Sequence, residues 1–408
     1  MRLLFIHQNF PGQFKLLSAA LAARSDCEVV ALGSAERVRG RTYARGVKVL
    51  GYPDRAPGPE DGRHTHHYLR EHERAVRRGQ DVARALLELH RKGFTPDVVV
   101  AHPGWGESLF VKDVFPRARL INLFEFFYAG NGADVGFDAE FPVNEDDRLR
   151  LRIKNNTQLQ ALAYCDQGLS PTQWQRSRFP ERFHPLIEVL HEGLDLTHLR
   201  PNPDARFTLP NGRVLSRGDR VLTYVARNLE PYRGFHVFMR ALPQLLAREP
   251  DLQVVVAGAT GVSYGSAPPK PHATHLDWLV AEGGRPDPER VHFTGPLPYG
   301  EYVKLLQVSS VHCYLTYPFV LSWSMLEAMA CGCAVLGSAT PPVQEFIEDG
   351  VNGRLFDFFD QAALRDGVSR LLREDTRALR ERARATVAER IDFHRHVLPR
   401  ALQLLGLT

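Results

Sequence analysis

Residues 317 to 340, YPFVLSWSMLEAMACGCAVLGSAT, place a short helical segment between two buried strands. The preceding run SVHCYLTY and the last ten residues or so are apolar enough for strands. The pattern around Met325 and Met329 is helical and ends at Gly332. A strand, a helix and a strand this close in sequence predict a βαβ unit in a parallel sheet. Glu327 is then a carboxylate on an otherwise apolar helix near the ligand-binding edge of that sheet.

The length and charge of the chain narrow the class of protein. With 408 residues, the chain is longer than one hydrophobic core usually holds, so we expect two domains. Its 51 basic and 47 acidic residues give a formal net charge of +4, which does not indicate nucleic acid but suits an anionic ligand. No apolar run reaches the roughly 18 residues needed to cross a bilayer.

The cysteines and the opening residues bear on location. Five cysteines without a disulfide spacing predict reduced thiols and a cytoplasmic protein. The opening MRLLFIHQNF is interrupted by polar residues, so we interpret it as a strand and not as a signal peptide. Peripheral contact with the inner face of the membrane stays open.

Two groups of potential metal ligands are interpreted as structural. Cys331 and Cys333 flank a glycine, but no second pair stands at zinc spacing, so we expect them to pack the end of a helix. The histidines of the loop and helix start near residue 66 lack a fixed helical spacing, and we expect a solvated surface there. These are His64, His66, His67 and His72. The sequence therefore predicts no metal site.

The N-terminal half begins like a Rossmann-like domain. RLLFIH, residues 2 to 7, predicts a strand, and Gly12 in the following loop lets the backbone approach a ligand. No GxGxxG follows, so a dinucleotide is not indicated. DVVVAH predicts a buried strand that delivers His102 to its carboxyl end, and the next loop carries Trp105 and Glu107. We favour a ligand-site role for His102 over that of a structural histidine.

A long loop and a polar stretch follow. Residues 129 to 147 are acidic and contain glycine and aromatic residues, and we expect this loop, with Asn131, to line an acceptor pocket. A helix is predicted from 147 to 164. We place the first domain at 1–195, a linker rich in Pro, Asn and Gly at 196–218, the second domain at 219–385, and a C-terminal helix at 386–408 that packs back toward the first domain.

The second domain opens with a strand, a loop and a helix. The strand VLTYVAR ends at Arg227, and Arg233 and Gly234 stand at the start of the next helix. Two guanidiniums and free helical amides at one sheet edge suit a diphosphate, which needs fixed charges with several donors. Surface arginines on a turn are the alternative interpretation.

Together these motifs resemble a GT-B glycosyltransferase of the family 4 group, which has two Rossmann-like domains facing each other across a deep cleft. LEAMACGCAVLGS and QEFIEDGVNGRLF are similar to the family's signature helix and to the segment after it. ARNLEPYRG is similar to its phosphate loop, with Arg233 where a lysine is usual, and VLHEGLD to the entry into the second domain. NFPGQF and VVVAHPGWGE are similar to the N-domain glycine loop and histidine strand.

The resemblance implies roles for individual residues. Glu327 would accept hydrogen bonds from the donor's ribose, while Arg227 and Arg233 would clamp the diphosphate. His102 would lie beside the transferred sugar, and Gly12 would leave room for acceptor and phosphate. The remaining donor-site residues implied are Leu297 at the base and Phe319, Val320, Leu321 and Ser322 at the sugar and phosphate; Trp105, Glu107 and Asn131 would lie on the acceptor side.

The chain departs from the family pattern at one position. The first glutamate of the family's E-x7-E signature would stand eight residues before Glu327, where this chain has Phe319. That glutamate holds hydroxyls of the donor sugar in the family, so the identity of the sugar stays open. A catalytically silent protein that binds nucleotide sugars or glycans is therefore one alternative, and a GT-B nucleotide-sugar epimerase is another.

The leading hypothesis is a retaining, metal-independent hexosyltransferase without a cofactor. Its donor would be a UDP- or GDP-linked sugar, and its acceptor a carbohydrate, a lipid-linked molecule or a small molecule. No paired carboxylates at a double-displacement spacing stand out, so a front-face route assisted by the leaving group is favoured over a covalent intermediate. Neither nucleic acid nor a transmembrane segment is expected.

Overall fold

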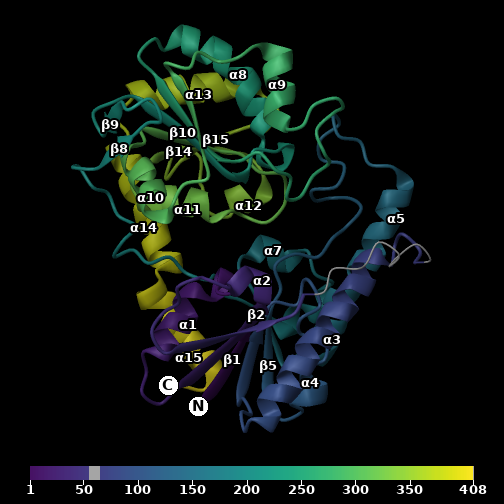
Figure 1. The fold of residues 1–408 in the computed structure, drawn as a ribbon. Helices are drawn as coiled ribbons and strands as arrows, with labels where there is room; N and C mark the ends of the chain where they lie inside the picture. The colour runs from purple at the N-terminus through teal and green to yellow at the C-terminus, as the bar shows by residue number, and fades with distance from the viewer. Residues whose placement is uncertain (55–64, 408) are drawn as a thin grey trace. The chain divides into compact units, whose positions relative to one another are not determined.

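The chain forms two compact α/β units, each built on a parallel sheet. The computed structural model describes residues 1–54 and 65–407, so His64 lies outside the described residues (Figure 1). The first unit consists of Met1–Gly193 and Phe393–Thr408, and the second of Leu194–Asp392. Two units with parallel sheets confirm the predicted fold class.

The first unit carries a seven-stranded sheet in the order β3-β2-β1-β4-β5-β6-β7, with parallel pairing throughout. Its strands are β1 (Arg2–Ile6), β2 (Glu28–Ser34), β3 (Val47–Tyr52), β4 (Val98–Ala101), β5 (Arg119–Leu123), β6 (Gln167–Ser170) and β7 (Ile187–Val189). Its helices are α1 (Lys15–Ala22), α2 (Ala35–Val38), α3 (Arg70–Arg91), α4 (Val111–Val114), α5 (Glu145–Lys154), α6 (Asn156–Tyr164), α7 (Gln173–Ser177) and α15 (Leu398–Leu405).

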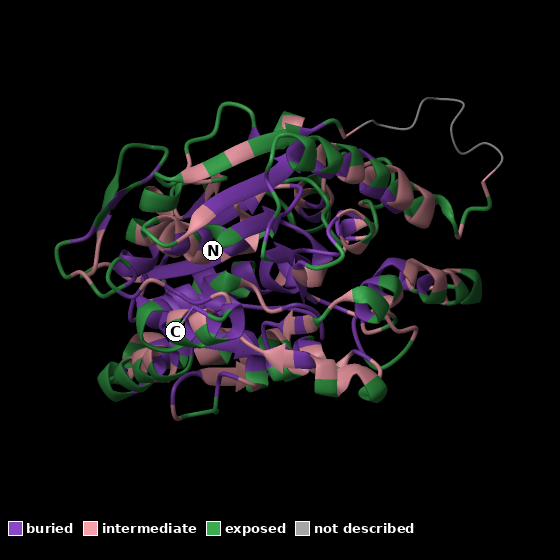
Figure 2. Cartoon of the chain, turned by 90° about the horizontal axis from the view of Figure 1, so that it is seen from below, coloured by how far each residue is buried: buried purple, intermediate pink, exposed green. Residues whose placement is uncertain are grey.

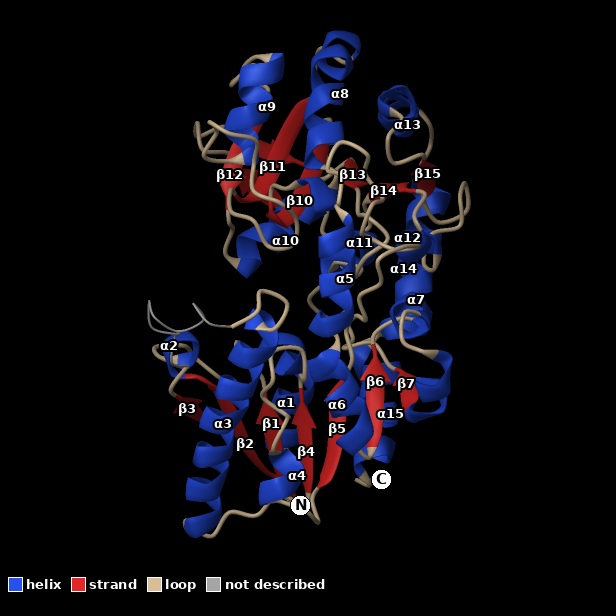
Figure 3. Ribbon diagram, turned by 90° about the vertical axis from the view of Figure 1, so that its right-hand side faces the viewer, coloured by secondary structure: helices blue, strands red, loops and turns tan. Residues whose placement is uncertain are grey.

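Side chains of β1 point alternately to the two faces of this sheet. Leu4 and Ile6 pack into a core cluster with residues of α3 and α4, whereas Leu3 and Phe5 pack into a second cluster with α1 and Leu405 of α15. Successive strand residues face opposite sides, so a strand that is apolar at every position needs helices on both faces. Figure 3 shows helices on both sides of the strands, and Figure 2 shows strands that are largely buried.

The predicted helix from 147 to 164 is two helices, α5 and α6, divided at Asn155. The Asn155 side chain accepts a hydrogen bond from the Tyr128 backbone N–H at 2.9 Å and donates to the Tyr128 carbonyl at 2.7 Å. A buried amide that satisfies both backbone groups of a neighbouring segment fixes that segment. Asn155 therefore ties the end of the residue 124–128 stretch, which follows β5, to the helix break.

The second unit carries a six-stranded parallel sheet in the order β12-β11-β10-β13-β14-β15. Its strands are β10 (Val221–Asn228), β11 (Gln253–Ala259), β12 (Val291–Gly295), β13 (Val311–Tyr314), β14 (Ala334–Ser338) and β15 (Arg354–Phe356). Its helices are α8 (Phe235–Arg248), α9 (His275–Gly283), α10 (Tyr299–Val308), α11 (Trp323–Ala330), α12 (Pro341–Gln344), α13 (Gln361–Arg373) and α14 (Arg377–Ile391).

The stretch from 196 to 218 is more ordered than the predicted linker. It contains β8 (Arg206–Thr208) and β9 (Val214–Ser216), which pair as an antiparallel hairpin. Phe207 and Leu215 of this hairpin are buried with Val221 and Leu305 in one core cluster of the second unit. The two short strands were not predicted, because Pro, Asn and Gly are typical of linkers and also of the turns before, between and after hairpin strands.

The last residues of the chain, Phe393–Thr408, belong to the first unit. Leu405 and Leu407 lie in the core cluster that contains Leu3 and Phe5. The chain therefore leaves the first unit after Gly193 and returns to it at Phe393.

A buried histidine lies in the central strand of the second unit. His312 on β13 is fully buried, and its Nδ1 lies 2.9 Å from the Thr223 hydroxyl of β10. Burial lowers the pKa of His312 to about 3, because the charged imidazolium would lose its hydration. His312 is therefore neutral in the folded protein at neutral pH.

Because His312 is buried in its neutral form, we expect acid to lower the free energy of unfolding. Its folded-state pKa lies below the unfolded value of 6.5, so the unfolded chain binds more protons between pH 6.5 and about 3. The free energy of unfolding should fall across that window, by at most about 5 kcal/mol from this group. Urea unfolding at a series of pH values should show a shallower decline for His312→Asn than for the wild type. The matched control is His198→Asn, at a side chain that is 80% exposed; equal pH slopes for wild type and His312→Asn would contradict the assignment.

Candidate functional site

In the first unit, polar side chains gather where three neighbouring strands end. His7 directly follows β1, His102 directly follows β4, and Glu125 stands two residues beyond β5. These strands are adjacent in the order β1-β4-β5, so their carboxyl ends meet at one edge. We call the group formed by His7, Gln13, His102, Trp105 and Glu125 the first-unit cluster.

Hydrogen bonds in this cluster converge on the Glu125 carboxylate. His7 Nε2 lies 2.8 Å from Gln13 Oε1, and the Gln13 amide donates to Glu125 Oε1 at 2.8 Å. His102 Nε2 lies 3.4 Å from Glu125 Oε2. The His102 ring also stacks on Trp105, with ring centroids 4.3 Å apart and an interplanar angle of 20°.

Backbone amides assign the tautomers of both histidines. The Asn9 N–H donates to His7 Nδ1 at 2.9 Å, and the Gly104 N–H donates to His102 Nδ1 at 3.2 Å. Each Nδ1 is therefore an acceptor, and the proton of each neutral ring sits on Nε2. Burial alone would raise the pKa of the Glu125 carboxyl, but the hydrogen bonds from His102 and Gln13 outweigh it and hold the pKa below its usual value. Glu125 is thus an ionised acceptor.

The predicted residues of this unit divide into two groups. His102 and Trp105 lie together in the first-unit cluster, as their positions after β4 suggested. Gly12 lies beside it with φ +47°, and a Cβ there would approach the His7 ring to 2.6 Å. A side chain at this position would therefore collide with the His7 imidazole, and the room that Gly12 is expected to leave for a ligand stays a prediction.

Glu107 and Asn131 have other surroundings than predicted. Glu107 is fully buried, accepts a hydrogen bond from the Tyr52 hydroxyl at 3.1 Å and lies 3.8 Å from Arg78 Nε. Burial raises the pKa of its carboxyl, against the lowering effect of Arg78. Glu107 thus faces the core of the first unit, and its acceptor-side role stays a prediction. Asn131 is exposed and accepts a hydrogen bond from Arg148.

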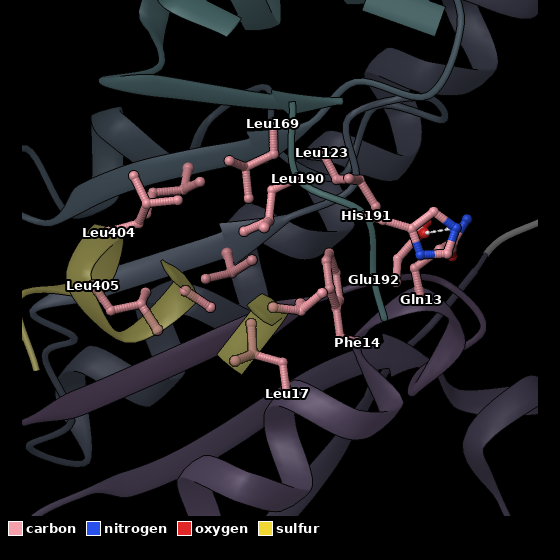
Figure 4. Close-up of a pocket in the computed structure, with 14 residues that line it drawn as sticks. Gln13, Phe14, Leu17, Leu123, Leu169, Leu190, His191, Glu192, Leu404 and Leu405 are labelled. Carbon is pink, nitrogen blue, oxygen red and sulfur yellow. Dashed lines mark ion pairs between the residues drawn. The ribbon is translucent and has the colours of Figure 1, made fainter. Parts of the chain in front are cut away.

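A cavity of about 50 Å³ lies next to Gln13 in the first unit. Figure 4 shows the leucine side chains that line it, with His191 and Glu192 at one end. His191 Nε2 and Glu192 Oε2 are 3.6 Å apart. The walls are almost entirely apolar, so this cavity offers no set of hydrogen-bonding groups for a sugar.

In the second unit, Arg233 organises the loop that follows β13. Its side chain is buried, and Nη1 donates to the Thr316 hydroxyl at 2.8 Å and to the Val320 carbonyl at 3.0 Å. The Tyr314 hydroxyl lies 3.5 Å from the same nitrogen and accepts a hydrogen bond from the Ser322 N–H at 2.8 Å. We call residues 315–322 the β13–α11 loop. Arg233 therefore fixes the approach to the first turn of α11.

A glycine permits this arrangement. Gly234, at the start of α8, has φ +67°, and a Cβ there would lie 2.4 Å from Leu315 Cβ. Any other residue would separate the start of α8 from the β13–α11 loop. The ends of β10 and β13 can thus approach each other closely, as their adjacent places in the sheet require.

Arg227 differs from Arg233 in its surroundings. It lies near the end of β10 with an exposed side chain. Within residues 1–54 and 65–407, no hydrogen bond or ion pair engages its guanidinium. The two arginines predicted as one clamp are therefore one buried, structural cation and one exposed cation that is available to a ligand.

Phe319 packs in an aromatic group at the same edge. Its ring centroid lies 4.9 Å from that of Tyr264 and 5.4 Å from that of Tyr232. The Glu230 carboxylate fixes the Tyr264 segment, because Oε2 accepts hydrogen bonds from the Ser263 and Tyr264 N–H groups at 3.0 and 3.1 Å. An apolar side chain thus stands where the family signature has a carboxylate.

Glu327 is buried on α11 and is bound by two phenols. Tyr302 donates to its Oε2 at 2.6 Å and Tyr299 to its Oε1 at 2.9 Å. Burial and the nearby Glu327 charge raise the pKa of Tyr302 well above its usual value, so Tyr302 stays a donor. Leu321 and Leu297 are partly buried against separate core clusters of this unit.

Several residues of these sites were not predicted from the sequence. In the first unit they are His7, Gln13 and Glu125; in the second they are Tyr299, Tyr302, Tyr314 and Thr316. His7 and Glu125 carried the same signal as His102, since each is a titratable residue within two positions of the carboxyl end of a strand. The tyrosine donors carried no signal, because tyrosines on a helix are ordinary core residues.

Two parallel α/β units with these strand-end residues define the GT-B class of glycosyltransferases. Residues 25–199 match the model of the glycosyl transferase family 4 group, and residues 209–390 match that of the glycosyl transferases group 1. The chain therefore belongs to the family 4 group of glycosyltransferases, with the second unit matching the model of the glycosyl transferases group 1. Among the described residues, no helix is both long and apolar enough to cross a membrane.

Curated relatives resemble about half of the chain. It is 29% identical over 216 residues to a GDP-mannose-dependent α-(1-6)-phosphatidylinositol monomannoside mannosyltransferase of Mycolicibacterium smegmatis, covering 51% of this chain and 53% of that protein. It is 28% identical over 237 residues to a D-inositol 3-phosphate glycosyltransferase of Salinispora tropica, covering 55% and 48%. The chain thus spans about half the length of the curated relatives it matches.

Solved structures resemble the whole chain in fold. Anabaena HepE in complex with UDP and glucose matches with a TM-score of 0.68 at 15% identity, with both chains fully covered. Sucrose-phosphate synthase from Thermosynechococcus elongatus matches with a TM-score of 0.73 at 17% identity, also over both full chains. At these identities the likeness shows the fold.

The different surroundings of the two arginines predict different costs of removing them. Arg233→Ala should lower the free energy of unfolding by about 2 kcal/mol or more, because it removes charge-assisted hydrogen bonds from buried acceptors. Arg227→Ala should change it by about 0.5 kcal/mol or less, as is usual for an exposed side chain. Urea unfolding of both variants measures this, and equal stabilities of the two variants would contradict the structural role of Arg233.

Proposed function

We propose that this protein transfers a sugar from a nucleoside diphosphate sugar to a hydroxyl of an acceptor with retention of configuration. The observation that carries the proposal lies in the second unit, where a fixed loop joins β13 to the first turn of α11. That turn presents backbone amides, Arg227 is exposed on the neighbouring strand β10, and α11 carries the Glu327 carboxylate. Amides and a cation suit a diphosphate, and a carboxylate suits ribose hydroxyls.

Charge development in the reaction explains why these groups would be needed. Cleavage of the bond between the anomeric carbon and the diphosphate leaves negative charge on the phosphate oxygens. Arg227, the remaining donors of Arg233 and the amides of α11 would stabilise that charge, and one such donor typically contributes about 3 kcal/mol to lowering the barrier. The acceptor oxygen bonds to the anomeric carbon on the face that the diphosphate leaves, and the acceptor proton passes to a leaving phosphate oxygen.

Two features bear on the donor. GDP is in the name of the mannosyltransferase relative, and UDP is bound in the HepE structures, so we propose a GDP- or UDP-linked hexose. Because arginine and amide donors can neutralise the diphosphate, we expect turnover without a divalent cation. Five free cysteines suit a reducing, cytoplasmic compartment.

Turnover assays test the proposal. GDP-mannose and UDP-glucose are each incubated with D-inositol 3-phosphate, and the release of nucleoside diphosphate is followed with and without EDTA. We expect release with one donor that depends on the acceptor, persists in EDTA, and gives a product with the anomeric configuration of the donor.

Two other outcomes would replace this function with another. Conversion of a donor to a second nucleotide sugar without acceptor would identify an epimerase. Tight nucleotide binding without turnover of either donor would identify a catalytically silent binding protein, for which Phe319 provides a reason, since the sugar-binding carboxylate of the family signature is missing.

A further inference from the structure

Glu125 is the member of the first-unit cluster that reaches the surface. Its side chain is 32% exposed, whereas His7 and His102 are each 2% exposed. The cluster therefore presents a carboxylate to solvent, supported from behind by the two buried imidazoles. An ionised carboxylate accepts hydrogen bonds and donates none.

Two side-chain amides hold Glu125 in place. The Gln13 amide donates to Oε1 at 2.8 Å, and the Gln175 amide donates to the Glu125 backbone carbonyl at 2.7 Å. Gln175 is 2% exposed, and its own side-chain oxygen lies 3.1 Å from the Thr172 hydroxyl. A side chain and backbone fixed in this way form a preorganised group, which is what a binding site requires.

The Glu125 carboxylate has a weaker hydrogen bond with His102 than with Gln13. At 3.4 Å it is longer than the usual range of about 2.7–3.2 Å for an N–H···O hydrogen bond. The other nitrogen of His102 is engaged by the Gly104 N–H. Of the acceptor atoms in the cluster, Oε2 of Glu125 is thus the one at which a hydrogen bond from a ligand would add the most binding free energy.

The surroundings of Oε2 indicate the chemistry of that donor. The negative charge disfavours phosphate and carboxylate ligands and favours hydroxyl donors. Trp105, which is half-buried and stacked on His102, adds an aromatic surface beside the ring that contacts Oε2. An apolar surface with one fixed acceptor suits a neutral ring that has both C–H faces and hydroxyl groups.

We propose that Glu125 binds a hydroxyl group of a sugar or cyclitol ring, which donates to Oε2 while the ring lies near Trp105. His7, Gln13, His102 and Gln175 are positioning residues for this carboxylate. The inference rests on the proposed function, in which the hydroxyl belongs either to the acceptor or to the transferred sugar. In both cases the contact adds affinity in the first unit and requires no proton transfer to Glu125.

Binding to the whole 408-residue chain tests this proposal. Titrations with myo-inositol, D-mannose and D-glucose, followed by saturation-transfer NMR, should show binding of at least one ring to the wild type. Glu125→Gln should weaken that binding by about tenfold or more, because it removes the charge from the acceptor. The matched control Glu36→Gln, at an exposed position on α2, should bind like the wild type.

Two results of the titrations would overturn the proposal. One is the absence of binding of all three rings to the wild type, and the other is unchanged affinity in Glu125→Gln. Glu125→Asp keeps the charge but shortens the side chain, so it should bind with intermediate affinity; unfolding curves and near-ultraviolet circular dichroism confirm that each variant is folded. A folded Glu125→Asp that binds no better than Glu125→Gln would assign Glu125 a merely structural role.

Kinetics separate the two sources of the hydroxyl and separate this proposal from the proposed function. With an active donor and acceptor pair, Glu125→Gln should raise the acceptor KM if the hydroxyl belongs to the acceptor, or the donor KM if it belongs to the transferred sugar. Turnover with both KM values unchanged would overturn the role of Glu125 and leave the transferase intact. An inactive wild type whose ring binding still depends on Glu125 would overturn the transferase and leave this site intact.

Discussion

The buried guanidinium of Arg233 is the interaction on which the site of the second unit depends. A buried cation is costly unless hydrogen bonds satisfy it, and Arg233 meets this requirement through Thr316 and the Val320 carbonyl. The β13–α11 loop thereby acquires one conformation, and α11 begins at a fixed place. The hydrogen bonds to Thr316 and Val320 both come from one nitrogen of the guanidinium, Nη1. The arginine at this position therefore combines a structural role with the proposed contact to a diphosphate.

The two units place different kinds of polar residues at the same edge of their sheets. Each collects polar side chains at the carboxyl ends of adjacent parallel strands, where the strands of a buried sheet can present them. In the second unit a cation and helix amides suit an anion, whereas in the first unit Gln13 and His102 both direct a hydrogen bond to the carboxylate of Glu125. The charges of the two sites are thus opposite, as expected if one binds a diphosphate and the other binds neutral hydroxyls.

The fold, and the side of each sheet where the carboxyl ends of its strands lie, were predicted from the sequence. Continuous apolar runs between turn residues made this possible, because they are characteristic of buried parallel strands. The same pattern placed His102 at the end of a strand, Arg233 before a helix and Glu327 on a helix, as the structure has them, and their roles toward a ligand stay predictions. It missed the pairing of Gln13 with Glu125, whose positions differ by 112, because such contacts depend on which strands become neighbours. It did not predict the burial of Glu107, because a glycine-bounded loop does not reveal that one of its side chains turns into the core.

A crystal structure of the protein soaked with GDP-mannose or UDP-glucose tests the central claim most directly. We expect the diphosphate against Arg227 and the first turn of α11, with the ribose hydroxyls at the Glu327 carboxylate in place of one or both phenol contacts. A nucleotide bound elsewhere, or one whose phosphates touch neither Arg227 nor α11, would contradict it.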